Sequence, residues 1–214
     1  AHLFEHLMFE GSAHHDSGYF RPLQQAGASL NGSTSCDRTN YWEVVPTGAL
    51  DLALWLESDR MGYLLPALTV TKFENQREVV LNERRQQYEN RPYGMALMVL
   101  MTSLFPQNHP YHWHTIGEVA DLRAATLEEA QTFFKTYYHP GNASLTVAGD
   151  VEIDIALAAG QHVRRLDGGP SRRAQAFHAV LAHADDGDPG AHKSSPARAL
   201  TAAAASALPP RWPL

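Results

Sequence analysis

The spacing of hydrophobic and polar residues divides this chain into alternating helical and extended segments. Helical spacing is predicted over the segments 1–10, 17–26, 50–65, 71–89, 93–105 and 126–137. Side chains alternate as in a strand over 29–45, and 143–148 has the apolar composition of a buried strand. No internal repeat relates these segments. Helices and strands in this mixed order predict an α+β fold.

Two local signals fix helix limits more closely than the spacing does. Gly27 follows the second helical segment as a typical C′ residue, because glycine adopts a positive φ without strain. Thr126 is followed three residues later by Glu129, the spacing of a capping box at a helix start. These signals favour a helix that ends at Ala26 and another that begins after Thr126.

The composition of the chain changes near residue 155. Beyond residue 165 the large apolar residues are Leu166, Phe177, Val180, Leu181, Leu200, Leu208, Trp212 and Leu214. So few anchors cannot offset an ordering cost of roughly 1–2 kcal/mol per residue. We therefore expect an ordered domain over 1–155 and a low-complexity, disordered tail over 156–214.

Charge and composition exclude several classes of function. The chain has 214 residues and a formal net charge of −6, which argues against nucleic acid or an anionic membrane as a partner. No apolar run reaches the roughly 18 residues of a membrane span, so none is expected. The lone Cys36 rules out an internal disulfide and is expected to pack rather than to react. The 12 histidines direct attention to metal chemistry.

The segment His2-Leu3-Phe4-Glu5-His6 carries the strongest chemical signal. On a helix, His2 and His6 share one face, so their two imidazoles can hold one metal ion. Glu5 lies about 100° around the helix from His6, where it can reach a water on that ion. This is the inverted zinc-protease order His-x-x-Glu-His, with Glu5 as the candidate base. The alternative is an exposed helix with incidental polar residues.

A third metal ligand is expected from the helix at 71–89. Its glutamates are Glu74, Glu78, Glu83 and Glu89. Glu83 extends the stripe formed by Phe73, Gln76, Val79 and Val80, whereas the other three fall away from it. A carboxylate on a core-facing stripe is costly unless it is paired or binds a metal, so this geometry favours Glu83. The alternative is a half-exposed glutamate in a run of charged residues.

The strand at 29–45 offers a place for a peptide. An extended peptide can pair with an exposed strand edge through backbone hydrogen bonds, which do not depend on its sequence. Asn31 and Gly32 lie in a small, polar stretch that allows close backbone approach beside a metal. An ordinary half-exposed strand is the alternative interpretation.

These motifs resemble the catalytic N-terminal domain of the insulinase/pitrilysin family of zinc peptidases. Glu83 follows His6 by 77 residues, which is similar to the spacing in that family. The resemblance covers residues 1 to about 155. The further matching segments are Leu30–Pro46, Asn75–Gln86, His109–Gly117 and Tyr138–Val151.

The resemblance implies the fold and the roles of the site residues. The fold would be a mainly antiparallel sheet with helices packed on one face. His2, His6 and Glu83 would bind Zn²⁺, and Glu5 would act as the general base. The substrate-binding edge strand would contain Asn31 and Gly32. Gln76 stands where many relatives have an assisting glutamate, so it can orient a neighbour but carries no charge.

The expected function is that of a zinc metalloendopeptidase, which hydrolyses peptide bonds in extended or unfolded polypeptides. The alternative is a non-catalytic structural or partner subunit of the same fold. Relatives place strands before the His-x-x-Glu-His motif and need a second homologous domain or subunit to close over the substrate. We therefore expect this chain to be a fragment that is truncated at its start and has negligible peptidase activity alone. Nothing in the sequence assigns a compartment.

Overall fold

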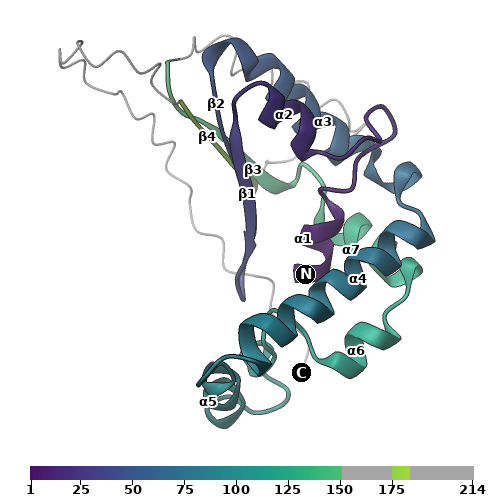
Figure 1. Cartoon of the computed structure of the whole chain (residues 1–214), viewed down its shortest axis with the longest axis vertical. Coiled ribbons are helices and arrows are strands. Elements are labelled where there is room, and N and C mark those ends of the chain that lie inside the picture. The colour runs from purple at the N-terminus through teal and green to yellow at the C-terminus, as the bar shows by residue number, and fades with distance from the viewer. Residues whose placement is uncertain (151–174, 184–214) are drawn as a thin grey trace, which may run out of the picture.

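The computed structural model describes residues 1–150 and 175–183. The helices are α1 (His2–Leu7), α2 (Phe20–Gln25), α3 (Leu50–Ala67), α4 (Val70–Arg84), α5 (Ala96–Leu104), α6 (Val119–Ala124) and α7 (Leu127–Tyr137). The strands are β1 (Ser29–Thr34), β2 (Thr39–Val45), β3 (Asn142–Val147) and β4 (Gln175–His183). The short turns are the 3₁₀ segments η1 (Thr47–Ala49) and η3 (Pro110–His112) and the π-helical η2 (Arg85–Glu89). Figure 1 shows α1, α3, α4 and α7 on one side of the sheet.

The described strands form one mixed sheet in the order β1-β2-β4-β3. The pair β1–β2 is antiparallel, whereas β4 runs parallel to both β2 and β3. The α+β class is confirmed, but the sheet is less antiparallel than expected. Parallel neighbours need a crossover of about a dozen residues or more, and the stretch between β3 and β4 is long enough for one.

The segment 29–45 forms a hairpin rather than the single strand predicted. Ser35 N donates a hydrogen bond to Arg38 O at 2.7 Å and closes the turn between β1 and β2. The pairing sets Gly32 opposite Tyr41. Alternation of side chains continues through a tight turn, so the alternation pattern did not reveal the break.

Strand β4 lies inside the tail that was expected to be disordered. Its neighbours β2 and β3 supply backbone hydrogen-bond partners on both sides. The expectation of disorder counted apolar residues only and did not include these backbone hydrogen bonds. The rest of the tail lies outside the described residues. The division of the chain at residue 155 stays a prediction.

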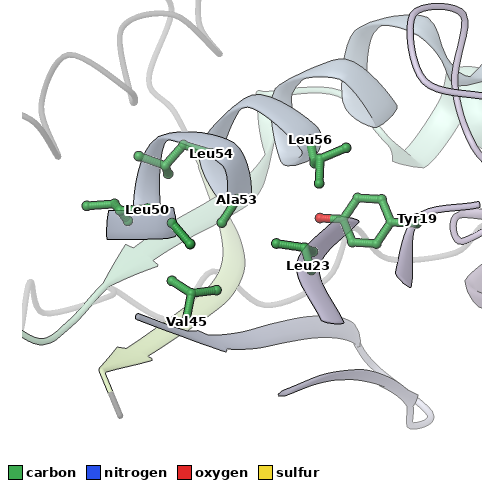
Figure 2. Close-up of a cluster of buried hydrophobic side chains, with 8 residues drawn as sticks. Tyr19, Leu23, Val45, Leu50, Ala53, Leu54 and Leu56 are labelled. Atoms are coloured by element: carbon green, nitrogen blue, oxygen red, sulfur yellow. The ribbon is translucent and has the colours of Figure 1, made fainter. Parts of the chain in front are cut away.

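Helix α3 packs on β2 and α2 to form the first core. The buried members of this core are Tyr19, Leu23, Val45, Ala49, Leu50, Ala53, Leu54 and Leu56. Figure 2 shows Leu50 and Ala53 of α3 on the side facing Val45, with Leu23 of α2 beside them. Amphipathic spacing predicted this helix, and it extends from Leu50 to Ala67 with a non-helical residue at Tyr63.

A second core surrounds α1, whose apolar face is fully buried. Phe4, Leu7 and Met8 are each at most 3% exposed and belong to a cluster with Tyr41 and Phe73. Helix α1 contacts both β1 and α4, so it lies between the edge of the sheet and the next helix layer. Its polar face is therefore held in a fixed orientation between these two elements.

A charged group, the Arg60 guanidinium, is buried against Tyr19 of the first core and Tyr41 of the second. The Arg60 guanidinium lies 3.9 Å from the Tyr19 ring centroid, and its Nε donates to Glu57 at 2.9 Å. The Tyr19 hydroxyl donates to Glu43, which is 1% exposed. Burial, followed by the nearby Glu57 carboxylate, raises the pKa of Glu43 to about 8. The helix pattern did not predict that charged side chains would be enclosed here.

The later helices differ in detail from the sequence prediction. Helix α4 continues through the π-helical η2 to Glu89, close to the predicted limit. Val79 is 44% exposed, so the buried stripe of α4 runs through Phe73 and Val80 without it. The Thr126–Glu129 capping box of α7 is present in full. In the part of the chain that the structure describes, no helix combines the length and hydropathy needed to cross a membrane.

Candidate active site

His2, His6 and Glu83 converge between α1 and α4. His6 Nε2 lies 3.3 Å from Glu83 Oε2, and His2 Nε2 lies 3.6 Å from the same oxygen. The two imidazole centroids are 4.8 Å apart. One ligand atom from each residue fits within 4.8 Å of the others. The three residues therefore form the kind of compact cluster that can hold one metal ion.

The local sequence explains why α1 presents both imidazoles on one side. His2 and His6 are separated by four residues, so they project from the same face of the helix. Phe4 and Leu7 occupy the opposite face and are buried in the second core. Burial of that apolar face fixes the rotation of α1 about its axis and turns the histidines toward α4.

The environment of His2 keeps its imidazole neutral. Burial lowers the pKa of His2 to about 4, and the charges of His6, the N-terminus and His114 act in the same direction. The contact between His2 and Glu83 is therefore not an ion pair near pH 7. His2 Nδ1 is buried without a hydrogen-bond partner among the described residues. A neutral imidazole keeps a lone pair on one nitrogen, and Nε2 is the nitrogen that faces Glu83, so His2 is suited to metal binding through Nε2.

The donor set fits zinc. Zinc sites with a catalytic role have three protein ligands drawn from His, Glu, Asp and Cys, which leaves one position for water or substrate. Two imidazoles and the Glu83 carboxylate meet this requirement, and Glu83 is the only carboxylate in the cluster. The chemistry of the residues therefore agrees with the zinc expectation.

Glu5 lies beside this cluster but points toward β1. The residue is 7% exposed, and Thr34 Oγ1 donates a hydrogen bond to Glu5 Oε2 at 2.5 Å. Burial raises the pKa of Glu5, while the Thr34 hydrogen bond and the charge of His6 act against this rise. The carboxylate is thus held apart from the three converging residues and in reach of groups bound near them.

Strand β1 passes close to Glu5 at Gly32. A Cβ placed on Gly32 would lie 2.9 Å from Glu5 Oε1 and 3.2 Å from the Phe9 ring. Only a glycine allows this approach without a shift of Glu5. Gly32 N donates to its neighbour Asn31 Oδ1 at 2.9 Å, so this amide is not used in pairing with β2. Among the described strands, β1 pairs with β2 alone and forms an edge of the sheet.

Gln76 contacts the carboxylate of Glu10 rather than that of Glu5 or Glu83. Its Nε2 donates to Glu10 Oε1 at 2.5 Å, and no hydrogen bond joins it to Glu5 or Glu83 among the described residues. Glu10 lies just beyond α1, four residues after His6. The interaction forms a second link between α1 and α4.

All of the site residues predicted from the sequence line one cavity of about 700 Å³. Its lining comprises His2, Glu5, His6, Phe9, Glu10, Phe20, Asn31, Gly32, Ser33, Thr34, Gln76, Glu83, Gln87, Tyr88, Thr115 and Ile116. Sequence reasoning missed Thr34, Glu10 and the aromatic wall of Phe9 and Phe20. Thr34 follows Gly32 by two residues and shares its face of the strand, a signal that was available.

The wall opposite β1 is held by Arg84, which the sequence analysis did not single out. Arg84 is buried, and its guanidinium donates to Gly117 O at 2.6 Å and to Glu89 Oε1 at 3.1 Å. The bond to Gly117 O ties the end of α4 to the loop that carries Thr115 and Ile116. The loop thereby completes the cavity beside Glu83.

Comparison with known proteins assigns the family. A model of the family described as Insulinase (Peptidase family M16) matches residues 1–117. The chain belongs to this peptidase family. A second model, described as the peptidase M16 inactive domain, matches residues 124–184. The resemblance drawn from the sequence motifs is therefore confirmed.

Curated relatives of this M16 chain include named proteases. The zinc protease PqqE of Helicobacter pylori is 36% identical over 152 residues, which cover 71% of this chain and 34% of that protein. The mitochondrial-processing peptidase subunit beta of Caenorhabditis elegans is 27% identical, over 73% of this chain and 34% of that protein. The chain thus spans about a third of the length of these relatives.

Solved structures agree with this assignment. A protease from Helicobacter pylori superposes with a TM-score of 0.71 at 29% identity, covering 83% of this chain and 42% of that one. A peptidase M16 inactive domain from Pseudomonas fluorescens superposes with a TM-score of 0.61 at 20% identity, covering 80% of this chain and 42% of that one. The second match supports the fold alone.

Proposed function

We propose that the cavity between β1 and α4 is the zinc centre of a metalloendopeptidase that hydrolyses extended peptides. The observation that carries this proposal is the convergence of His2, His6 and Glu83 beside the buried carboxylate of Glu5. Relatives named as zinc proteases support the same hypothesis of a zinc peptidase site. His2, His6 and Glu83 would hold the metal.

The chemistry divides between the metal and Glu5. Zinc, when bound, supplies a Lewis acid that activates water near neutral pH. Glu5 acts as the general base, because its carboxylate lies beside the metal-binding cluster and is not needed as a ligand. It accepts the proton of the attacking water and later delivers a proton to the leaving amine. Thr34 holds the carboxylate in position through its hydrogen bond to Oε2.

The edge of β1 binds the peptide backbone in this proposal. An extended peptide would add to the open side of β1 as a further strand. The Gly32 amide, which does not pair with β2, is available for this interaction once the Asn31 side chain moves aside. The absence of a side chain at Gly32 brings the peptide backbone close to Glu5. Asn31 and Gly32 thus serve as substrate-binding residues.

A second homologous domain or subunit is proposed as the partner that closes the cavity. The chain spans about a third of the curated relatives, and one of these is named as a subunit. The alternative is a non-catalytic subunit of the same fold. Such a subunit would not need His2, His6 and Glu83 to converge beside Glu5. Full turnover is therefore expected when the partner is present, and slow cleavage from this chain alone.

Glu5→Gln provides the test. The zinc-loaded chain and the variant are incubated with an unstructured peptide, and cleavage is followed by mass spectrometry, which detects slow reactions. A placed general base contributes roughly 10²–10⁴ in rate, so the variant should retain zinc and lose cleavage by about this factor. Equal cleavage by both proteins would show that another group takes the proton. Failure of the wild-type chain to bind zinc would contradict the proposal as a whole.

A further inference from the structure

Glu10 is a carboxylate in the cavity that the proposed chemistry does not use. It is half-buried at the end of α1 and lines the same cavity as Glu5 and Glu83. Glu10 Oε1 accepts a hydrogen bond from Gln76 Nε2. A neutral amide orients this carboxylate but does not neutralise its charge.

The charge of Glu10 has no cationic partner in the described part of the chain. No Lys, Arg or His nitrogen there lies within 4.0 Å of its carboxylate. The lining of the cavity likewise includes no lysine or arginine. By contrast, Glu83 faces two imidazoles and Glu5 accepts a bond from Thr34. Glu10 is therefore the carboxylate in this cavity that is left for a ligand.

Two aromatic rings line the cavity in which Glu10 lies. Phe9 and Phe20 both line the cavity, and their ring centroids are 4.6 Å apart. Lysine and arginine side chains pack their aliphatic stems on apolar surfaces while the charged end reaches a polar group. A cavity lined by two aromatic rings and by a carboxylate can offer both contacts to one such side chain.

We propose that Glu10 is a specificity-determining residue that binds a lysine or arginine side chain of the peptide substrate. The charged group forms a hydrogen-bonded ion pair with the Glu10 carboxylate, and the aliphatic stem packs against Phe20. Gln76 holds the carboxylate in the orientation that receives it. This inference rests on the proposed peptidase function, because the basic side chain belongs to the peptide cleaved at that site.

Peptide binding to the Glu5→Gln variant tests this inference without any need for turnover. The zinc-loaded variant is titrated with fluorescent unstructured peptides that carry one lysine at successive positions. Matched peptides carry norleucine, which keeps most of the stem and lacks the charge. Fluorescence anisotropy gives each dissociation constant. The same titrations are repeated with two double variants, in which Glu10→Gln or Glu78→Gln is added to Glu5→Gln. Glu78→Gln is the control, because it removes the same charge from the exposed face of α4.

The lysine peptide should bind roughly 10- to 100-fold more tightly than its norleucine partner at one position, as expected for a charge-assisted hydrogen bond. Glu10→Gln should remove this preference and Glu78→Gln should keep it. Equal binding of the lysine and norleucine peptides would overturn the inference. A preference for lysine that survives Glu10→Gln would overturn it too. The proposed function would stand in either case. If no peptide binds at all, the proposed peptide site is wrong and the inference fails with it.

Discussion

Thr34 and Glu5 connect β1, at the edge of the sheet, to helix α1. Thr34 Oγ1 donates to Glu5 Oε2 at 2.5 Å across 29 residues of sequence. The bond fixes the rotamer of a carboxylate that burial has separated from water. In the proposed function, this one hydrogen bond joins peptide binding at β1 to proton transfer by Glu5.

Replacement of Thr34 by valine should slow peptide cleavage by about tenfold or more, because the charged carboxylate loses its positioning donor. Zinc content should not change, since in the described part of the chain Thr34 hydrogen-bonds to Glu5 and Thr39 and to none of the converging residues His2, His6 and Glu83. Thr34→Ser keeps the hydroxyl and should retain most of the rate. Single-turnover cleavage, together with zinc analysis, measures both effects. Equal rates for Thr34→Val and wild type would show that Glu5 needs no positioning bond.

Gly32→Ala should impair cleavage without unfolding the protein. The added Cβ would lie 2.9 Å from Glu5 Oε1, the end of a flexible side chain that can move aside. The expected result is a loss in cleavage rate of roughly tenfold or more at unchanged melting temperature and zinc content, because a displaced base is poorly aligned. Gly48→Ala is the control, since nothing lies within 4 Å of a Cβ at that position. A Gly32→Ala variant as active as Gly48→Ala would argue against close approach at β1.

Glu83→Gln should weaken zinc binding by roughly tenfold or more, because the site loses its anionic ligand. The amide is similar in size, so the packing of α4 is preserved. Elemental analysis and competition with a chelator measure occupancy and affinity. Glu78→Gln, on the exposed face of the same helix, should leave both unchanged. Zinc content equal to that of wild type would remove Glu83 from the site.

Glu43 should make the stability of the fold depend on pH. Its pKa is raised from 4.5 to about 8, so in this window the folded chain holds a proton that the unfolded chain has released. Stability contributed by this group is therefore present at low pH and is lost as the pH rises from about 4.5 to about 8. Glu43→Gln imitates the protonated form. Its melting temperature should fall less than that of wild type, by a few degrees, between pH 5 and pH 8.

Melting curves at several pH values, recorded by circular dichroism, measure this difference. Glu78→Gln removes a charge from the exposed surface and should follow the pH dependence of wild type. Parallel curves for Glu43→Gln and wild type would show that the buried carboxyl group releases its proton at an ordinary pH.

The sequence by itself determined the parts of the site that depend on local geometry. Four-residue spacing places His2 and His6 on one face of any helix that contains them, and the structure has their rings 4.8 Å apart. The Thr126–Glu129 capping box likewise needs only neighbouring residues. Glu83 was favoured because a carboxylate beside a buried stripe requires a partner. Helical repeat, capping and the cost of burial are properties of short segments, and so the sequence displays them.

The tertiary structure decided which distant residues meet. Packing of α1 against β1 brings Thr34 to Glu5, and packing of α1 against α4 pairs Gln76 with Glu10 rather than with Glu83. The mixed sheet depends on β4, which the composition of the tail did not predict. Such contacts join segments far apart in the chain, and their energy depends on how helices and strands pack together. The periodicity of residues within a single segment does not predict how that segment packs against the others.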